Sequence, residues 1–325
     1  MDFFKSFKQK VFNIHSLDFE ETSVELFKYQ YKYNELYQNY VQMLGKNPEM
    51  VKGITDIPFL PIDFFKNHRI VTDKWASDAF FESSGTTGLR PSIHYIRDLD
   101  FYLHLSEIIF VNKFGPLENY RILALLPSYL ERQHSSLIAM VQGFIRKAAE
   151  GSGFYLNNYE ELLETLKHSD EKKVIIWGVT FAILELAEKY PQDLSQTLII
   201  ETGGMKGRRE ELTREEFYQY LRKQLNVVDV FAEYGMTELL SQAYAENGKF
   251  TSSDSMKVLV RDINDPFEYV EKGKTGGLNI IDLANIHSCS FIETKDLGRI
   301  GEDDTFEVLG RFDNSDLRGC NLMVP

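Results

Sequence analysis

The pattern that most restricts the fold is an alternation of strand-like and helix-like segments through the middle of the chain. Helix patterns begin near Ser135, Thr180 and Thr213, and a further helix is expected after Thr237. The strand patterns that alternate with them span residues 122–126, 173–177, 197–201 and 227–232. Such alternation predicts an α/β fold with a mainly parallel sheet flanked by helices. Ligands of these sheets bind at the carboxyl ends of the strands.

The flanking regions carry other patterns. Apolar residues recur at helical spacing from about Thr22 to Leu44, which predicts one helix, and two prolines favour an extended connector over residues 57–66. After about Ser252, short strand patterns predict a C-terminal antiparallel, β-barrel-like subdomain. The expected parts are an N-terminal helical and extended region packed on the core (1–79), an α/β nucleotide-binding core (80–250), a β-rich subdomain (251–310) and a truncated hinge or C-terminal tail (311–325).

Composition bounds the partners and the location. The net charge of -13 argues against nucleic acid, because the phosphate backbone would be repelled. Two cysteines, Cys289 and Cys320, are fewer than secreted disulfide-rich proteins usually carry, so a cytoplasmic protein is expected. The N-terminus has no continuous apolar segment like that of a signal peptide. The longest apolar run, residues 174–187, is too short to cross a bilayer, so no membrane span is expected.

A run of small residues is the first candidate for a ligand site. It lies between the strand-like residues 80–81 and 93–95, and Arg90 follows it closely. Hydroxyls, glycine amides and a guanidinium can together surround an anion. The alternative is a flexible turn, since small-residue loops are common. The run consists of Ser83, Ser84, Gly85, Thr86, Thr87 and Gly88.

Two loops at predicted strand ends carry further candidates. In the loop 233–238, Thr237 could hydrogen-bond a phosphate and Glu238 could hold a magnesium ion, which prefers oxygen ligands. In the loop 202–208, the paired glycines Gly203 and Gly204 would let a flat ring lie against the backbone. Either loop could equally be a plain turn between strand and helix.

A third cluster lies near the C-terminus. Asp296 could accept hydrogen bonds from two ribose hydroxyls, and Arg311, in the sequence Gly310-Arg-Phe-Asp313, could reach the same sugar or a carboxylate. The alternative is a salt-bridged pair on a hairpin.

Taken in order, these clusters resemble the adenylate-forming enzymes, which include the acyl-CoA synthetases and firefly-type luciferases. The run at 83–88 resembles their phosphate-binding loop, and Tyr234-Gly235-Met-Thr-Glu238 resembles their YGxTE motif. Asp296 matches the ribose-binding aspartate, and residues 310–313 match the hinge motif. Shorter matches, Ile57-Pro-Phe-Leu-Pro-Ile62, Ser128-Tyr-Leu-Glu-Arg132 and Arg318-Gly-Cys320, resemble the acyl-protein synthetases of bacterial bioluminescence.

The sequence departs from the superfamily at three places. Arg90-Pro91 stand where a lysine is usual, and Lys295 stands where a glycine is usual. The sequence ends at Pro325, where the superfamily's smaller C-terminal domain would begin. The acyl-protein synthetases are also short.

The resemblance implies an AMP-forming acid–thiol ligase that uses ATP and Mg²⁺. A carboxylic acid, expected to be a fatty acid, would become an acyl-adenylate and then pass to a thiol. The thiol could be Cys320, followed by an acyl-acceptor protein, or it could be coenzyme A. His134 would line the acyl pocket. The implied roles are phosphate binding for residues 83–88 and Arg90, α-phosphate contact for Thr237, metal binding for Glu238, adenine contact for Gly203, Gly204 and Tyr234, and ribose binding for Asp296 and Arg311.

Two other functions remain open from the sequence. One is an acyl- or aryl-CoA ligase that uses a separate or vestigial second domain. The other is a degenerate, non-catalytic nucleotide-binding protein. The intact Thr237-Glu238 pair favours a catalyst, because a scaffold has no need of it.

Overall fold

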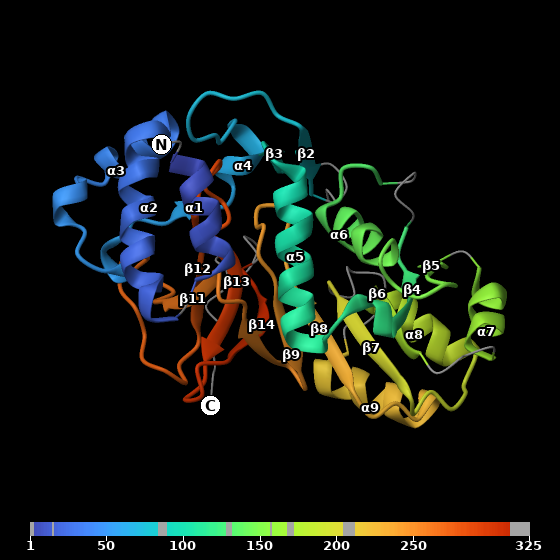
Figure 1. Cartoon of the computed structure of the whole chain (residues 1–325). Coiled ribbons are helices and arrows are strands. Elements are labelled where there is room, and N and C mark those ends of the chain that lie inside the picture. The colour runs from blue at the N-terminus through green and yellow to red at the C-terminus, as the bar shows by residue number, and fades with distance from the viewer. Residues whose placement is uncertain are drawn as a thin grey trace.

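A twelve-stranded mixed sheet runs through the computed structural model, which describes residues 3–14, 16–83, 90–127, 132–156, 158–167, 172–203 and 212–312 (Figure 1). The order is β11-β12-β13-β14-β10-β9-β8-β7-β6-β4-β5, with β1 beside β13, and β2 and β3 form a separate hairpin. The strands are β1 Leu60–Pro61, β2 Ala79–Glu82, β3 Ile93–Ile96, β4 Tyr120–Leu125, β5 Gly153–Phe154, β6 Lys173–Val179, β7 Thr197–Thr202, β8 Val230–Tyr234, β9 Ala243–Glu246, β10 Lys249–Ser252, β11 Met256–Arg261, β12 Gly276–Asp282, β13 Phe291–Ile300 and β14 Phe306–Arg311. The helices are α1 Phe3–Phe12, α2 Phe19–Tyr33, α3 Glu35–Met43, α4 Phe64–Asn67, α5 Leu99–Phe114, α6 Ser136–Ile145, α7 Tyr159–Lys167, α8 Thr180–Lys189 and α9 Arg214–Leu225.

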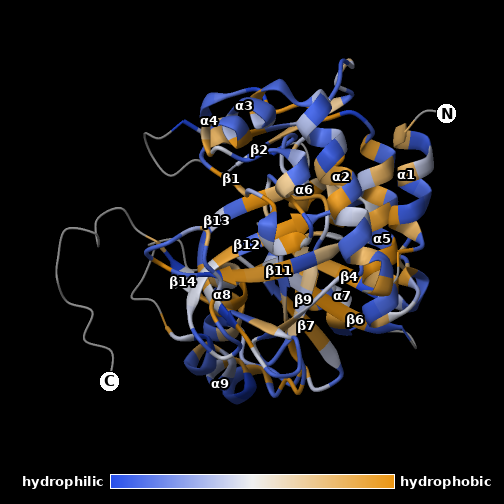
Figure 2. Ribbon diagram, turned by 90° about the vertical axis from the view of Figure 1, so that its left-hand side faces the viewer, coloured by the Kyte–Doolittle hydropathy of each residue, from blue (hydrophilic) through white to orange (hydrophobic). Residues whose placement is uncertain are grey.

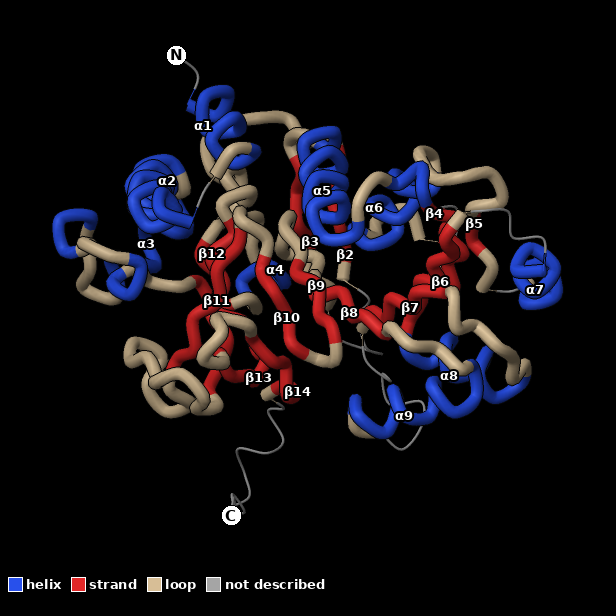
Figure 3. The backbone as a smooth tube through the Cα atoms, turned by 60° about the horizontal axis from the view of Figure 1, so that its bottom comes forward, coloured by secondary structure: helices blue, strands red, loops and turns tan. Residues whose placement is uncertain are grey.

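The parallel half of the sheet confirms the predicted α/β class. Strands β5, β4, β6, β7 and β8 pair in parallel, with α5 and α6 over one face and α8 and α9 over the other (Figure 3). Every residue of β4 is buried, as expected for a strand covered on both faces. Three helix starts were predicted correctly: Ser135 caps α6, α8 begins at Thr180, and Thr213 forms a capping box with Glu216 at α9.

The C-terminal strands continue the same sheet. β9 pairs antiparallel with β8, and the path through β10, β14, β13, β12 and β11 stays antiparallel. The β-rich region expected after residue 250 is therefore hydrogen-bonded to the parallel strands without a break. The carboxyl end of β8, where the parallel part stops, adjoins this region.

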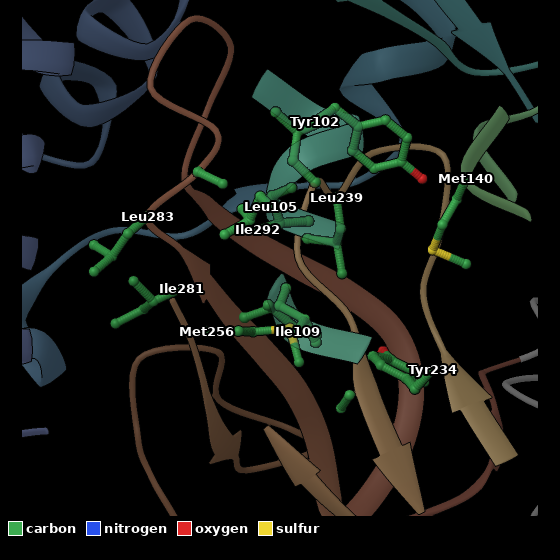
Figure 4. Close-up of a cluster of buried hydrophobic side chains, with 14 of the residues drawn as sticks. Tyr102, Leu105, Ile109, Met140, Tyr234, Leu239, Met256, Ile281, Leu283 and Ile292 are labelled. Atoms are coloured by element: carbon green, nitrogen blue, oxygen red, sulfur yellow. The ribbon is translucent and has the colours of Figure 1, made fainter. Parts of the chain in front are cut away.

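The hydrophobic core joins the helices to both halves of the sheet. Leu105 and Ile109 of α5 lie against Ile292 and Met256 of the sheet (Figure 4). On the hydropathy scale β7 and β11 are largely hydrophobic, whereas the outer helix α9 is largely hydrophilic (Figure 2). None of the described helices is both long enough and apolar enough to cross a membrane.

The N-terminal segment is tied to the sheet by a strand and by buried polar contacts. β1 pairs in parallel with β13, with Leu60 opposite Ile292. Gln30 of α2 is fully buried, and its Nε2 donates to the Asn285 carbonyl at 2.9 Å while its Oε1 accepts from the Ser290 amide at 2.9 Å. These contacts fix the turn that links β12 to β13.

Two helix predictions were wrong. The helix expected from 22 to 44 is two helices, because the chain leaves the helix at Asn34, whose side chain accepts from the Tyr37 amide and starts α3. The described residues 238–242 do not form the helix expected after Thr237. The amides of Leu240 and Ser241 instead donate to the buried carboxylate of Asp282 at 2.7 and 3.0 Å, and the chain turns into β9.

Candidate functional site

The predicted anion loop arises from a well-formed hairpin. β2 and β3 pair antiparallel, with Phe81 opposite His94, as the sequence indicated. At the open end the Ser83 amide donates to the Ser92 carbonyl at 3.1 Å, and the Ser92 amide donates to Ser83 Oγ at 2.9 Å. Ser84, Gly85, Thr86, Thr87 and Gly88 lie outside the described residues, and Arg90 beyond them is exposed.

The Thr237–Glu238 loop lies directly against this hairpin. The ring of His94 donates from Nδ1 to the Thr237 carbonyl at 2.8 Å, which fixes the tautomer with a proton on Nδ1. Asn285 Nδ2 donates to the Glu238 carbonyl at 2.7 Å. Glu238 is 5% exposed; burial raises the pKa of its carboxyl, and a hydrogen bond with Ser92 opposes that rise. Ser92, at the loop end of the hairpin, therefore contacts the carboxyl of Glu238, which is predicted to bind a metal.

Tyr234, Asp296 and Arg311 meet, as the resemblance required. The Tyr234 hydroxyl donates to Asp296 Oδ2 at 2.8 Å, and Arg311 Nε lies 3.1 Å from Asp296 Oδ1. Asp296 and Arg311 are paired across β13 and β14. Burial raises the pKa of Asp296, although the charge of Arg311 opposes it. Each carboxylate oxygen keeps a lone pair free of these two contacts, so the group could still accept two hydroxyls.

Gly203 reaches the same edge. It follows Thr202, which pairs with Glu233 in the sheet, so it comes level with Tyr234. Its φ of +74° lies in the left-handed region that favours glycine. Gly235 lies so close to Glu233 that a Cβ at position 235 would overlap the Glu233 carboxyl. Gly204 and Cys320 lie outside the described residues.

His134 lies on the outer side of the hairpin. Its ring stacks on Phe80 with centroids 4.0 Å apart, and its carbonyl accepts from the Glu82 amide at 2.7 Å. It lines a cavity of about 350 Å³ together with Phe80, Leu103 and Arg146. The cavity gives the predicted pocket role a physical basis in which an apolar wall meets polar groups.

Sequence reasoning missed the side chains that hold the loops in place. His94, Asn285 and Asp282 bind the backbone of residues 237–241 from distant segments, and no local pattern marks them. Glu201 and Glu233 could have been suspected, because each is a carboxylate at the end of a buried parallel strand. Lys295, where the resemblance has a glycine, forms an ion pair with Asp63 at 2.5 Å.

The class of fold follows from solved structures. ATP-bound MatB from Rhodopseudomonas palustris superposes with a TM-score of 0.56 and 18% identity, covering 74% of this chain and 49% of MatB. O-succinylbenzoate coenzyme A synthetase (MenE) from Bacillus subtilis, in complex with ATP and magnesium, gives a TM-score of 0.55 and 18% identity, covering 73% and 50%. The chain thus has the fold of adenylate-forming enzymes and spans about half the length of these structures.

A family match gives a more specific similarity. Residues 8–98 match the family described as Acyl-protein synthetase, LuxE. No curated protein matches the sequence significantly. The resemblance to adenylate-forming enzymes of the acyl-protein synthetase type is confirmed by this match together with the fold.

Proposed function

We propose that this chain activates a carboxylic acid, expected to be a fatty acid, by AMP transfer from ATP and passes the acyl group to a thiol. The observation that carries the proposal is a series of interactions that runs from Ser92, at the loop end of the hairpin, through Glu238 and Arg311 to Asp296. Ser92 contacts Glu238, the charge of Arg311 acts on Glu238, and Arg311 pairs with Asp296. Segments predicted separately for phosphate, metal and ribose are thereby neighbours.

The first step would form one bond and break one. A carboxylate oxygen of the acid attacks the α-phosphorus, and the bond to the bridging oxygen breaks so that pyrophosphate leaves. Charge builds on the phosphate oxygens, and donors fixed in place stabilise it without reorganisation. Thr237 would contact the α-phosphate, and the residues from Ser83 to Gly88 with Arg90 would hold the leaving pyrophosphate.

The nucleoside would lie along the carboxyl ends of β7 and β8. Gly203, Gly204 and Tyr234 would flank the adenine. Asp296 and Arg311 would hold the ribose, because the carboxylate is already oriented by the Tyr234 hydroxyl.

The residues present fit a magnesium ion held largely by its nucleotide. Among the described residues, no three His, Cys, Asp or Glu side chains gather as a metal site, so Glu238 would be the protein ligand beside phosphate oxygens. The ion would neutralise phosphate charge. Burial raises the pKa of the Glu238 carboxyl, and a cation beside it would favour the ionised form.

The second step needs a thiol, and Cys320 is the internal candidate. Its sulfur would attack the acyl carbonyl and AMP would leave, after which a partner protein could accept the acyl group. The other cysteine, Cys289, is unsuited, because burial raises the pKa of its thiol to about 12. Coenzyme A is the alternative acceptor, which would make the protein an acyl- or aryl-CoA ligase.

ATP–pyrophosphate exchange dependent on an added acid tests the first step. A panel of fatty, aryl and short-chain acids should contain members that support exchange. If no acid does so while ATP still binds, the protein is a non-catalytic nucleotide-binding protein.

Acyl labelling tests the second step. Incubation with ATP and a radiolabelled acid should give protein label that hydroxylamine removes, and Cys320→Ser should abolish that label. Cys289→Ala is the matched control and should keep it. Unchanged labelling of Cys320→Ser, with thioester formed on added coenzyme A, would establish the CoA ligase instead.

A further inference from the structure

Two buried carboxyl groups at the carboxyl edge of the sheet take no part in the reaction described above. Glu201 is the next-to-last residue of β7 and is 4% exposed, and Glu233 is the next-to-last residue of β8 and is 8% exposed. Their partners separate them: Glu201 contacts Thr180 of α8 and Tyr218 of α9, whereas Glu233 contacts Thr202. They therefore lie on opposite faces of the sheet, because Thr202, which is paired with Glu233, follows Glu201 and its side chain alternates to the other face.

The contacts of Glu201 determine where a proton must be. Thr180 Oγ1 lies 2.9 Å from Glu201 Oε2 and 2.9 Å from the Gly203 carbonyl oxygen. A hydroxyl has one proton, and a carbonyl oxygen can only accept. If Thr180 donates to Gly203, the contact with Glu201 is a full hydrogen bond only when the carboxyl carries the proton and donates it to Thr180. A protonated Glu201 thus completes a chain from carboxyl to hydroxyl to carbonyl.

The surroundings favour the neutral acid. Burial raises the pKa of Glu201. Arg214 Nε, 3.7 Å from Oε1, is the largest opposing influence on this pKa, but its side chain is 34% exposed and therefore screened. The hydrogen bonds of Thr180 and Tyr218 to the carboxyl also oppose the rise. The Tyr218 hydroxyl lies 3.5 Å from Oε1, the oxygen that also faces Arg214. On the other face of the sheet, burial raises the pKa of Glu233 to about 7.

We propose that Glu201 and Thr180 are a positioning pair, in which the protonated Glu201 frees the Thr180 hydroxyl to hold the Gly203 carbonyl and so fixes the turn that flanks the nucleotide base. This inference rests on the proposed function for its ligand. Ionised Glu201 would take the Thr180 proton for itself and release the carbonyl. The turn after β7 would then lose the bond that sets its start.

The expected effect of each variant follows from the protons that it leaves for donation at positions 201 and 180. Glu201→Gln supplies an amide N–H in place of the carboxyl proton and should keep the ATP dissociation constant within about 3-fold of wild type. Glu201→Ala and Thr180→Val break the chain and should weaken ATP binding about 3- to 10-fold, the range expected for one hydrogen bond. Thr180→Ser keeps the hydroxyl and should restore binding. The KM for the acid should change less than the KM for ATP.

The pH profile separates positioning from simple stability. The folded-state pKa is raised, so the neutral form is present at low pH and lost as the pH rises through the folded value. ATP affinity of the wild type should therefore fall as the pH rises through that folded value, and Glu201→Gln should remove part of that fall. Glu233→Gln is the matched control on the other face, because it removes the titration of Glu233 and its charge coupling to Glu201 while leaving the contact between Glu201 and Thr180 in place.

ATP binding is measured directly with a non-hydrolysable analogue, and exchange is measured in parallel. Analogue binding with the predicted variant pattern, in the absence of exchange with any acid, would retain this inference and reject adenylation. Normal exchange combined with wild-type analogue affinity in Glu201→Ala would reject this inference and retain adenylation. A Glu201→Gln protein as weak as Glu201→Ala, or with an unchanged pH profile, would also overturn it.

Discussion

Asp282→Asn is expected to destabilise the protein and misplace the Thr237–Glu238 loop. The Asp282 carboxylate is fully buried and accepts from the amides of Leu240, Ser241 and Ala284 at 2.7, 3.0 and 3.0 Å. It also accepts from the Ser241 hydroxyl at 2.7 Å. An asparagine keeps one accepting oxygen and turns an NH₂ toward the remaining donors.

The magnitude follows from the donors that lose an acceptor. With its oxygen toward Leu240 and Ser241, the new amide faces the Ser241 hydroxyl, which can rotate and accept, and the Ala284 N–H, which cannot. One stranded buried donor costs about 1–3 kcal/mol, and the remaining bonds lose their charge assistance, so about 2–4 kcal/mol is expected. With an unfolding entropy of roughly 0.7 kcal/mol/K for 325 residues, the Tm should fall by about 3–6 °C.

Thermal unfolding of Asp282→Asn beside Asp254→Asn, a change at an exposed residue, measures the effect. The control should stay within about 0.5 kcal/mol of wild type, which is below 1 °C. Exchange activity of Asp282→Asn should also fall at temperatures well below its Tm. A Tm within 1 °C of wild type together with full exchange would refute the reasoning.

Three other outcomes are expected. Tyr234→Phe removes the donor to Asp296 and should raise the KM for ATP in exchange about 10-fold, or ~1.4 kcal/mol, with little change for the acid. Glu238→Gln should lower exchange at least about 100-fold and raise the Mg²⁺ concentration needed for half-maximal rate, a shift that a merely structural role would not cause. Burial lowers the pKa of His94 to about 4 and that of His287 to about 3, below the unfolded value, so both stabilise the fold above pH ~6.5. Urea unfolding should show that stability falls from pH 6.5 toward 4, by about 3 kcal/mol for His94, and His94→Gln should flatten that slope.

Local chemistry was enough to predict much of the fold. Thr213 and Glu216 are three residues apart, so their capping box could be read directly, and Asp98 likewise caps α5. The alternating apolar runs identified the parallel strands because burial on both faces imposes a continuous pattern. The predictions that failed depended on contacts between residues far apart in the sequence. Residues 238–242 have a helical composition, and only Asp282, more than forty positions away, takes the amides that a helix would use.

The same distinction applies to the candidate site. Tyr234, Asp296 and Arg311 were found because they stand in recognisable motifs, and the structure brings them together. The contacts that position the motifs could not be predicted from the sequence, because each joins segments separated by long stretches of chain. His94 reaches Thr237 across 143 positions, and nothing in the order of residues states that β3 lies beside that loop.

The loop from Thr237 to Ser241 is held through its backbone, and this bears on how the site can work. His94 and Asn285 bind the carbonyls of Thr237 and Glu238, and Asp282 binds the amides that follow. Because these side chains bind main-chain atoms, they do not occupy the Thr237 hydroxyl or the Glu238 carboxyl, although the carboxyl also has a hydrogen bond with Ser92. A loop fixed in this way has its donors placed before charge develops on phosphate, which is the condition under which they lower a barrier most. In the proposed reaction, the buried polar residues around the loop would therefore contribute to rate as well as to stability.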